Sequence, residues 1–209
     1  FSRAKTSART DSGVTRRGKG PNMARQTHDF DEEARKIFAS LNLSPERASL
    51  YNNLDAIWEH PETKARFYVG NQTAAASREI LDQHNITAVV NATDNMPLYH
   101  EGEGIDYYRF HISGWMTATH GKHSAAALNT FFYPVWSFID DHLEQGHNVM
   151  VHCLAGAHRA GTTGVAYIMY KNRIPALQAI KAAKTCRPII NPIGLLRQLV
   201  KHYETGLLK

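Results

Sequence analysis

Hydrophobic residues in this chain are spaced in two ways: every three or four positions in some segments, and in short continuous runs in others. The first spacing is typical of amphipathic helices and the second of strands buried in a sheet. The pattern predicts helices over residues 31–41, 44–60, 73–84, 124–144, 160–171, 175–186 and 193–206, and strands at 67–69, 86–91, 107–112 and 149–151. Residues 113–124 are polar and contain glycine, which predicts a loop.

Several of these helices have recognisable starts. Ser44-Pro45 and Asn191-Pro192 each place a capping side chain before a proline, the order favoured at the first positions of a helix. Ser124 is a similar cap, and Pro134 should interrupt or kink the helix that follows it. Because strands alternate with helices, we expect an α/β fold with a central, mainly parallel sheet flanked by helices on both faces.

Composition limits the classes of protein that the chain can belong to. It has 209 residues, of which 43% are hydrophobic, enough for one compact domain. No run of 18 apolar residues occurs, so we expect no membrane span. Its two cysteines, Cys153 and Cys186, are too few for a disulfide framework, which favours a reducing compartment such as the cytoplasm.

The formal net charge of +5 is concentrated near the N-terminus. Residues 1–27 carry seven basic residues and one acid, a net charge of +6, whereas residues 28–209 are nearly neutral at −1. We therefore predict a flexible basic arm over residues 1–27 and one domain over residues 28–209. The charge of the domain argues against nucleic-acid binding by the domain itself.

The basic arm is open to three interpretations. It fits a solvated tail, an organellar transit peptide whose glycines weaken any amphipathic helix, or a segment that docks on an acidic partner. Nucleic acid, anionic lipid and an acidic protein assembly such as a cytoskeletal microtubule all carry the charge that a docking arm requires. The sequence does not choose among them.

The stretch with the clearest chemistry runs from His152 to Thr162. It follows an apolar strand, precedes a helical run and contains two glycines, so backbone N–H groups and a helix N-terminus can surround an oxyanion. The same positive potential favours the thiolate of Cys153, the nucleophilic form. Arg159, six residues later, has a planar fork of donors suited to phosphate oxygens. These features indicate phosphoryl transfer through a cysteinyl-phosphate intermediate.

At these residues the chain resembles the cysteine-dependent dual specificity phosphatases, particularly the mitogen-activated-protein-kinase phosphatase type. The resemblance covers residues 66–205 and continues through Phe67–Asn71, Ile86–Thr93, Tyr107–Ser113, Phe138–Asp140, Ala166–Met169 and Asn191-Pro192. It implies that Cys153 is the nucleophile and Arg159 the phosphate-binding arginine. It also implies that the main-chain amides of the intervening residues form the phosphate-binding loop: Leu154, Ala155, Gly156, Ala157 and His158.

The resemblance further implies a phosphoprotein substrate, with phosphate on tyrosine, on serine or threonine, or on both. The loop contains no lysine, which disfavours highly anionic phosphoinositide head groups. Histidines are numerous, but no paired cysteines and no HExxH pattern accompany them. We therefore expect no metal and no other cofactor.

Two positions depart from the family's pattern. Alignment with the family places Gly114 or Trp115 where the family has the aspartate that protonates the leaving oxygen. General acid catalysis typically contributes 10²–10⁴ in rate. His120 and His123 are candidate substitutes, and Asp94 is a further one. The alternative, which the polar composition of these segments favours, is that each is a solvated loop or turn residue. The second departure is Ala160, at a position where the family usually has the hydroxyl of Ser or Thr.

The sequence therefore supports two hypotheses. One is an active protein phosphatase that works through Cys153 and Arg159. The other is a catalytically weak or inactive scaffold on the same fold, docked on an acidic partner or assembly through residues 1–27.

Overall fold

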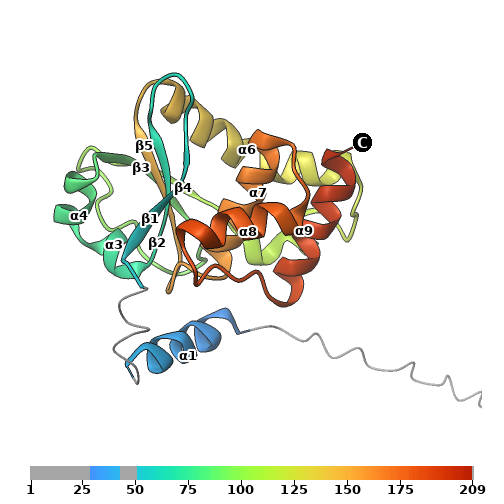
Figure 1. Ribbon diagram of the computed structural model, residues 1–209, viewed down its shortest axis with the longest axis horizontal. Helices are drawn as coiled ribbons and strands as arrows, with labels where there is room; N and C mark the ends of the chain where they lie inside the picture. The colour runs from blue at the N-terminus through green and yellow to red at the C-terminus, as the bar shows by residue number, and fades with distance from the viewer. Residues whose placement is uncertain (1–28, 43–50, 209) are drawn as a thin grey trace, which may run out of the picture.

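The computed structural model describes residues 29–42 and 51–208, and its centre is a mixed β-sheet (Figure 1). The strands are β1 (Leu54–Glu59), β2 (Arg66–Gly70), β3 (Ile86–Asn91), β4 (Asp106–Arg109) and β5 (Asn148–His152). They lie in the order β1-β2-β5-β3-β4, with β1 antiparallel to β2 and every other pair parallel. This confirms the predicted α/β fold with a mainly parallel sheet.

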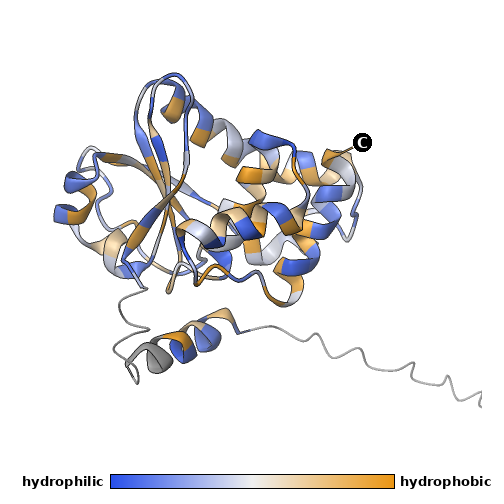
Figure 2. Ribbon diagram, viewed as in Figure 1, coloured by the Kyte–Doolittle hydropathy of each residue, from blue (hydrophilic) through white to orange (hydrophobic). Residues whose placement is uncertain are grey.

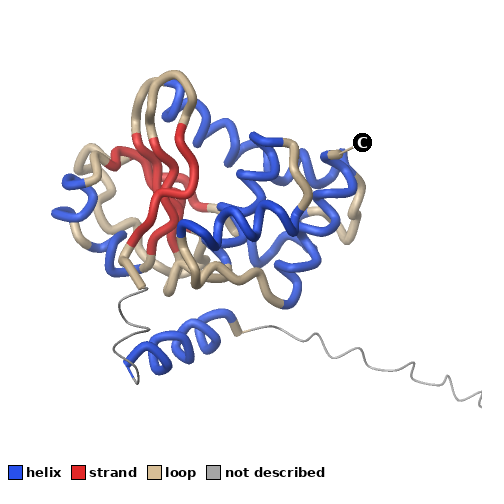
Figure 3. The backbone as a smooth tube through the Cα atoms, in the orientation of Figure 1, coloured by secondary structure: helices blue, strands red, loops and turns tan. Residues whose placement is uncertain are grey.

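Helices cover both faces of the sheet, as Figure 3 shows. The short helices α3 (Gln72–Ala76) and α4 (Arg78–Gln83) lie on one face. On the other face lie α6 (Ala125–Glu144), α7 (Arg159–Asn172), α8 (Ala176–Cys186) and α9 (Gly194–Leu207). The remaining described helices are α1 (Phe30–Asn42), a 3-10 turn η1 (Ile112–Gly114) and α5 (Trp115–Ala118).

Two hydrophobic clusters hold these layers together, and the alternation of side chains along β5 separates them. Val149 and Val151 point into the larger cluster, beneath α6, α7 and α9, while Met150 points into the smaller cluster beneath α3 and α4. Figure 2 shows the corresponding hydrophobic residues along the strands and on parts of the helices. The central strand β5 is therefore buried on both faces, and the loop that follows it is fixed at its base.

Local sequence patterns predicted the positions of several helices and strands correctly. The predicted strand at 86–91 is β3, and the helices predicted over 160–171, 175–186 and 193–206 differ from α7, α8 and α9 by at most one residue at each end. Ser124 caps α6, its Oγ accepting the N–H of Ala127 at 3.2 Å, and Pro134 lies within that helix.

The helix predicted over 44–60 is wrong where the structure describes it, because residues 54–59 form β1. Its cap, Ser44-Pro45, lies outside the described residues. Helical spacing in this segment is overridden by the antiparallel ladder with β2, in which Leu54 pairs with Gly70 and Glu59 with Arg66. Trp58, an aromatic residue favoured in strands, lies within that ladder.

Three other boundaries also differ from the sequence prediction. The helix predicted over 73–84 is divided at Ser77, whose extended backbone ends α3 and whose Oγ caps α4. The strand predicted at 107–112 ends at Arg109, and the predicted loop over 113–124 contains α5. Asn191-Pro192 does not start α9, because Ile193 is the cap and the N–H of Asn191 bonds to the carbonyl of Ala157.

The predicted basic arm, residues 1–27, lies outside the described residues, so the division into arm and domain stays a prediction. Of the helices that the structure describes, none combines the length and the hydropathy needed to cross a membrane.

Candidate active site

The loop from Cys153 to His158 joins β5 to α7 at the edge of the sheet where the parallel strands end. Cys153 and Arg159 are both buried, with 3% and 6% of their surfaces exposed. The end of β5 positions the cysteine and the first turn of α7 positions the arginine, so the two residues stand at the two ends of one short loop. The order of strand, loop and helix agrees with the sequence prediction, and the roles assigned to Cys153 and Arg159 stay predictions.

The carbonyl groups of this loop are held by donors outside it. The carbonyl of Leu154 accepts the N–H of Gln72 at 3.0 Å, and that of Ala157 accepts the N–H of Asn191 at 2.9 Å. The carbonyl of His158 accepts the N–H and the hydroxyl of Thr162. Because a peptide N–H points away from its own carbonyl, this outward anchoring leaves the loop amides to face an anion.

Arg187 completes this anchoring. Its Nε donates to the carbonyl of Gly156 at 2.9 Å and its Nη2 to the carbonyl of Ala155 at 3.1 Å. Its Nη1 donates to Asp55 Oδ2 at 2.6 Å and to the carbonyl of Asn52 at 2.9 Å. Sequence reasoning missed this residue, because it lies 31 positions from Gly156 and follows a helix without any local motif.

Gly156 occupies a backbone position that another residue could not share. Its φ is +66°, in the left-handed region. A Cβ at this position would lie 2.5 Å from the carbonyl oxygen of Gly70 and 2.8 Å from Nη2 of Arg187. The glycine therefore permits both the turn of the loop and its close approach to β2.

The hydroxyls nearest to Ala160 are bound within α7. Thr162 Oγ1 donates to the carbonyl of His158 at 2.6 Å, and Thr163 Oγ1 donates to the carbonyl of Arg159 at 3.0 Å. Both side chains are fully buried, and so is Ala160. These threonine hydroxyls are therefore engaged with the helix backbone and do not replace the hydroxyl that the family usually has after the arginine.

A cavity of about 280 Å³ opens beside Arg159. Asp94 also lines it and accepts or shares a proton with His111, whose Nδ1 lies 2.7 Å from Asp94 Oδ1. Ser113, next to Gly114, is a third wall residue. The full lining comprises Asp29, Phe30, Asp31, Asp94, Ser113, Arg159 and Leu195.

The two histidines considered as acids lie elsewhere. His120 is in a turn with a left-handed backbone, and the ring of His123 lies 4.1 Å from the ring of His202 and 5.3 Å from that of Trp115. Neither histidine lines the cavity at Arg159. Trp115, which could have packed on a substrate ring, is completely buried in the core instead.

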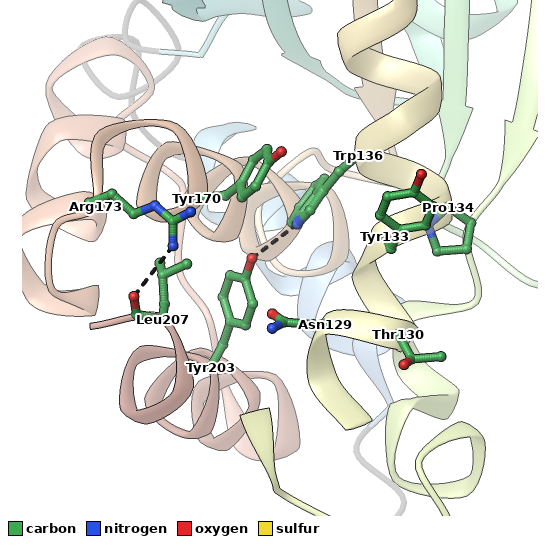
Figure 4. Close-up of a pocket in the computed structure, with 9 residues that line it drawn as sticks. All are labelled: Asn129, Thr130, Tyr133, Pro134, Trp136, Tyr170, Arg173, Tyr203 and Leu207. Carbon is green, nitrogen blue, oxygen red and sulfur yellow. Dashed lines mark hydrogen bonds between the residues drawn. The ribbon is translucent and has the colours of Figure 1, made fainter. Parts of the chain in front are cut away.

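A larger cavity, of about 530 Å³, lies between α6, α7 and α9 (Figure 4). Its wall is rich in aromatic side chains, and the indole N–H of Trp136 donates to the hydroxyl of Tyr203 at 3.1 Å. Arg173 Nη1 approaches the carbonyl of Leu207 at 3.4 Å. The cavity contains none of the residues that the sequence assigned to phosphate chemistry.

His152, directly before the cysteine, is a neutral buried imidazole. Burial lowers its pKa to about 3, and the nearby Arg109 cation acts in the same direction. Its ring lies 6.4 Å from that of Tyr99. The residue before Cys153 therefore adds no positive charge to the loop at neutral pH.

The buried imidazole should make the domain less stable in mild acid. The native pKa of about 3 lies below the unfolded value near 6.5, so the unfolded chain binds the extra proton between these values. We expect His152 to remove about 1.4 kcal/mol of unfolding free energy per pH unit as the pH falls below 6.5. Urea unfolding at pH 7, 6 and 5 should show a shallower decline for His152→Gln than for the unchanged chain. Equal declines would contradict the assignment.

The loop between β5 and α7 places this protein in the class of cysteine-dependent phosphatases. A family model described as "Dual specificity phosphatase, catalytic domain" matches residues 67–205, well over half of the chain. The chain therefore belongs to the dual specificity phosphatase family.

Individual relatives agree with this assignment. Dual specificity protein phosphatase 1 of Mus musculus is 32% identical over 142 residues, which are 68% of this chain and 36% of the relative. The protein of the same name from Arabidopsis thaliana is 28% identical over 133 residues, 63% of each chain. The chain thus spans about a third of the length of the mouse relative and less than two thirds of that of the plant relative.

Solved structures show the same fold. The crystal structure of human DUSP28 is 19% identical, with a TM-score of 0.58, and the match covers 75% of this chain and 95% of that one. The crystal structure of DUSP15 is 24% identical, with a TM-score of 0.52, and the match covers 66% and 82%.

Proposed function

We propose that this protein is a phosphoprotein phosphatase that works through a cysteinyl-phosphate intermediate. The Cys153 thiolate attacks phosphorus, a sulfur–phosphorus bond forms, and the bond from phosphorus to the ester oxygen breaks. Water then attacks the phosphorus, which releases inorganic phosphate and restores the thiolate. Arg159 and the loop amides bind the non-bridging oxygens in both steps.

The observation that carries this proposal is the orientation of the phosphate loop. All five carbonyls from Leu154 to His158 accept hydrogen bonds from residues outside the loop or from α7. The amides are thereby set around the position above the cysteine, and Arg159 adds a charged planar donor beside them. Such a preorganised set of donors stabilises the charge that develops on a transferring phosphoryl group.

Asp94 is our candidate for the acid that protonates the leaving oxygen. It lines the cavity that contains Arg159, whereas His120 and His123 do not. His111, at 2.7 Å, is the partner that orients its carboxyl group. In this proposal Asp94 takes over the role left vacant by Gly114, from the loop after β3 instead of the segment after β4.

The substrate class is a phosphorylated protein side chain. This follows from the family, whose named members are dual specificity protein phosphatases. The local positive charge of Arg159 and the neutral state of His152 suit one phosphate group more than a polyanionic head group. We place the activity in the cytoplasm, because two cysteines are too few for a disulfide framework and this favours a reducing compartment.

Turnover of an aryl phosphate by the purified chain tests the proposed function. We expect release of nitrophenolate from para-nitrophenyl phosphate, and release at the level of the uncatalysed reaction for Cys153→Ser. Serine preserves the shape of the site but is not ionised at neutral pH, so the nucleophile is lost. Equal rates for both proteins would contradict the proposal.

Such a result would favour the second candidate function, a scaffold on a phosphatase fold. Gly114 and Ala160 favour this candidate, because each removes a group that assists catalysis in the family. The predicted basic arm at residues 1–27 would then dock the domain on an acidic protein partner or assembly.

A further inference from the structure

We propose that α1 is an intramolecular competitor for phosphate, which places the carboxylate of Asp31 on Arg159 where a substrate phosphate would bind. The inference rests on the proposed function only in taking Arg159 as the phosphate-binding residue. The interaction surface is the outer rim of the phosphate loop, and its occupant is an acidic amphipathic helix of the same chain. Figures 1 and 3 show α1 along the edge where the loops after the parallel strands gather.

One face of α1 is seated on the phosphate loop itself. Ala34 is only 2% exposed and shares a hydrophobic cluster with Ala155 and Ala157 of the loop. Ile37, one turn further on, packs against the same cluster together with Leu154. Positions 30, 31, 34 and 37 recur at helical spacing, so a single face carries every contact described here. The seat fixes which end of the helix reaches the catalytic arginine.

At that end, Asp31 forms an ion pair with Nη2 of Arg159. The Arg159 side chain is 7% exposed and that of Asp31 is 29% exposed, so the pair is largely shielded from water. The ring of Phe30 lies 6.0 Å from the Arg159 guanidinium carbon, and both residues line the cavity. A carboxylate thus occupies a fork whose geometry suits phosphate equally well.

The two glutamates next to Asp31 have partners other than Arg159. Glu32 pairs with Arg35 at 3.2 Å and Glu33 with Lys36 at 2.8 Å, both along the exposed part of the helix. Asp29 caps the helix, its Oδ1 accepting the N–H groups of Asp31 and Glu32 at 3.0 Å each. Of the three acids in the first turn, Asp31 is the one paired with the phosphate loop's arginine.

A substrate phosphate can displace the Asp31 carboxylate from Arg159. A carboxylate offers one negative charge and two oxygens, whereas a phosphate monoester offers nearly two charges and three oxygens to the same donors. Substrate therefore displaces Asp31 once its concentration is high enough, and the affinity measured is reduced by the fraction of molecules in which α1 is seated. The helix raises the phosphate concentration at which the site fills.

Oxyanion binding to the full chain tests this inference without requiring turnover. In a Cys153→Ser background, isothermal titration with tungstate should give a dissociation constant on the order of tenfold lower for Asp31→Asn, the effect of losing one charge-assisted contact. Ala34→Glu, which puts a charge into the apolar seat, should tighten binding similarly. The matched control Glu32→Gln removes a neighbouring acid of α1 and should leave the affinity unchanged.

Unchanged affinity in both Asp31→Asn and Ala34→Glu would overturn the inference, and so would an equal gain in Glu32→Gln. An affinity that weakens as protein concentration rises would overturn the intramolecular assignment in favour of α1 from a second copy. The readout separates this inference from the proposed function. If Asp31→Asn tightens tungstate binding but the unchanged chain does not hydrolyse aryl phosphate, the role of α1 is supported and the phosphatase activity is rejected. If the unchanged chain hydrolyses aryl phosphate but Asp31→Asn does not tighten tungstate binding, the activity is supported and the role of α1 is rejected.

Discussion

Replacing Arg187 with methionine should cost about 3–5 kcal/mol of unfolding free energy and abolish most phosphatase activity. The side chain is 1% exposed, and its loss would leave the Asp55 carboxylate, itself only 13% exposed, without its charged partner. The Gly156 carbonyl would also lose its donor and the Ala155 carbonyl would keep only the Tyr51 hydroxyl, so this part of the loop would be free to turn inward. Urea unfolding and aryl phosphate turnover measure the two effects.

A second substitution separates stability from loop geometry. Adding Asp55→Leu to Arg187→Met removes the unpaired charge, so much of the unfolding free energy should return. Activity should not return, because the Gly156 carbonyl still lacks its donor and the Ala155 carbonyl is held by the Tyr51 hydroxyl alone. Arg66→Met is the matched control: Arg66 pairs with Glu59 at 3.1 Å, but both side chains are about half exposed, and such pairs contribute about 0.2–1 kcal/mol. Recovery of activity in the double variant would contradict the positioning role of Arg187.

Asp94→Asn should lower the turnover of a serine phosphate peptide by about 10²–10⁴ while changing that of para-nitrophenyl phosphate little. An alkoxide leaving group needs a proton in the transition state, whereas nitrophenolate is stable enough to leave without one. The ratio of the two rates is therefore more informative than either rate, and it distinguishes loss of the acid from general damage to the site.

Asp106→Asn provides the comparison for this substitution. Asp106 also carries an exposed carboxylate bonded to a histidine, with His142 Nε2 at 3.1 Å from its Oδ2, but it does not line the cavity at Arg159. We expect the same rate ratio as in the unchanged chain. A ratio that is equally unaffected in Asp94→Asn would exclude Asp94 as the acid.

Local sequence was sufficient where one short segment determines the outcome. The strand β3, the cap of α6 and the order of β5, loop and α7 around Cys153 and Arg159 all depend on residues within a few positions of one another. The roles of β1, Arg187 and Asp31 could not be predicted in this way. β1 depends on its ladder with β2, Arg187 on carbonyls more than 30 positions away, and Asp31 on an arginine 128 positions later.

The candidate proton donor could be predicted only in part from the sequence. Sequence reasoning named Asp94 among its candidates but could not rank it above His120 and His123, because all three lie in polar segments with no period. Whether each side chain lies near Arg159 depends on which loops come together at the end of the sheet. That arrangement is known only once the order of the strands is known.

The clamp that Arg187 places on the phosphate loop also has a consequence for how the protein folds. The guanidinium joins the loop to Asn52 and Asp55, which are 135 and 132 positions away along the chain, and the Tyr51 hydroxyl reaches Ala155 across 104 positions. Contacts that close such long loops form slowly, because the chain entropy must be lost before they contribute. When synthesis has just passed Arg159, the nascent chain therefore contains the complete sequence motif, but the loop does not yet have its native conformation. The shaped phosphate site arises only after α8 has been made and docked, so it belongs among the late events of folding.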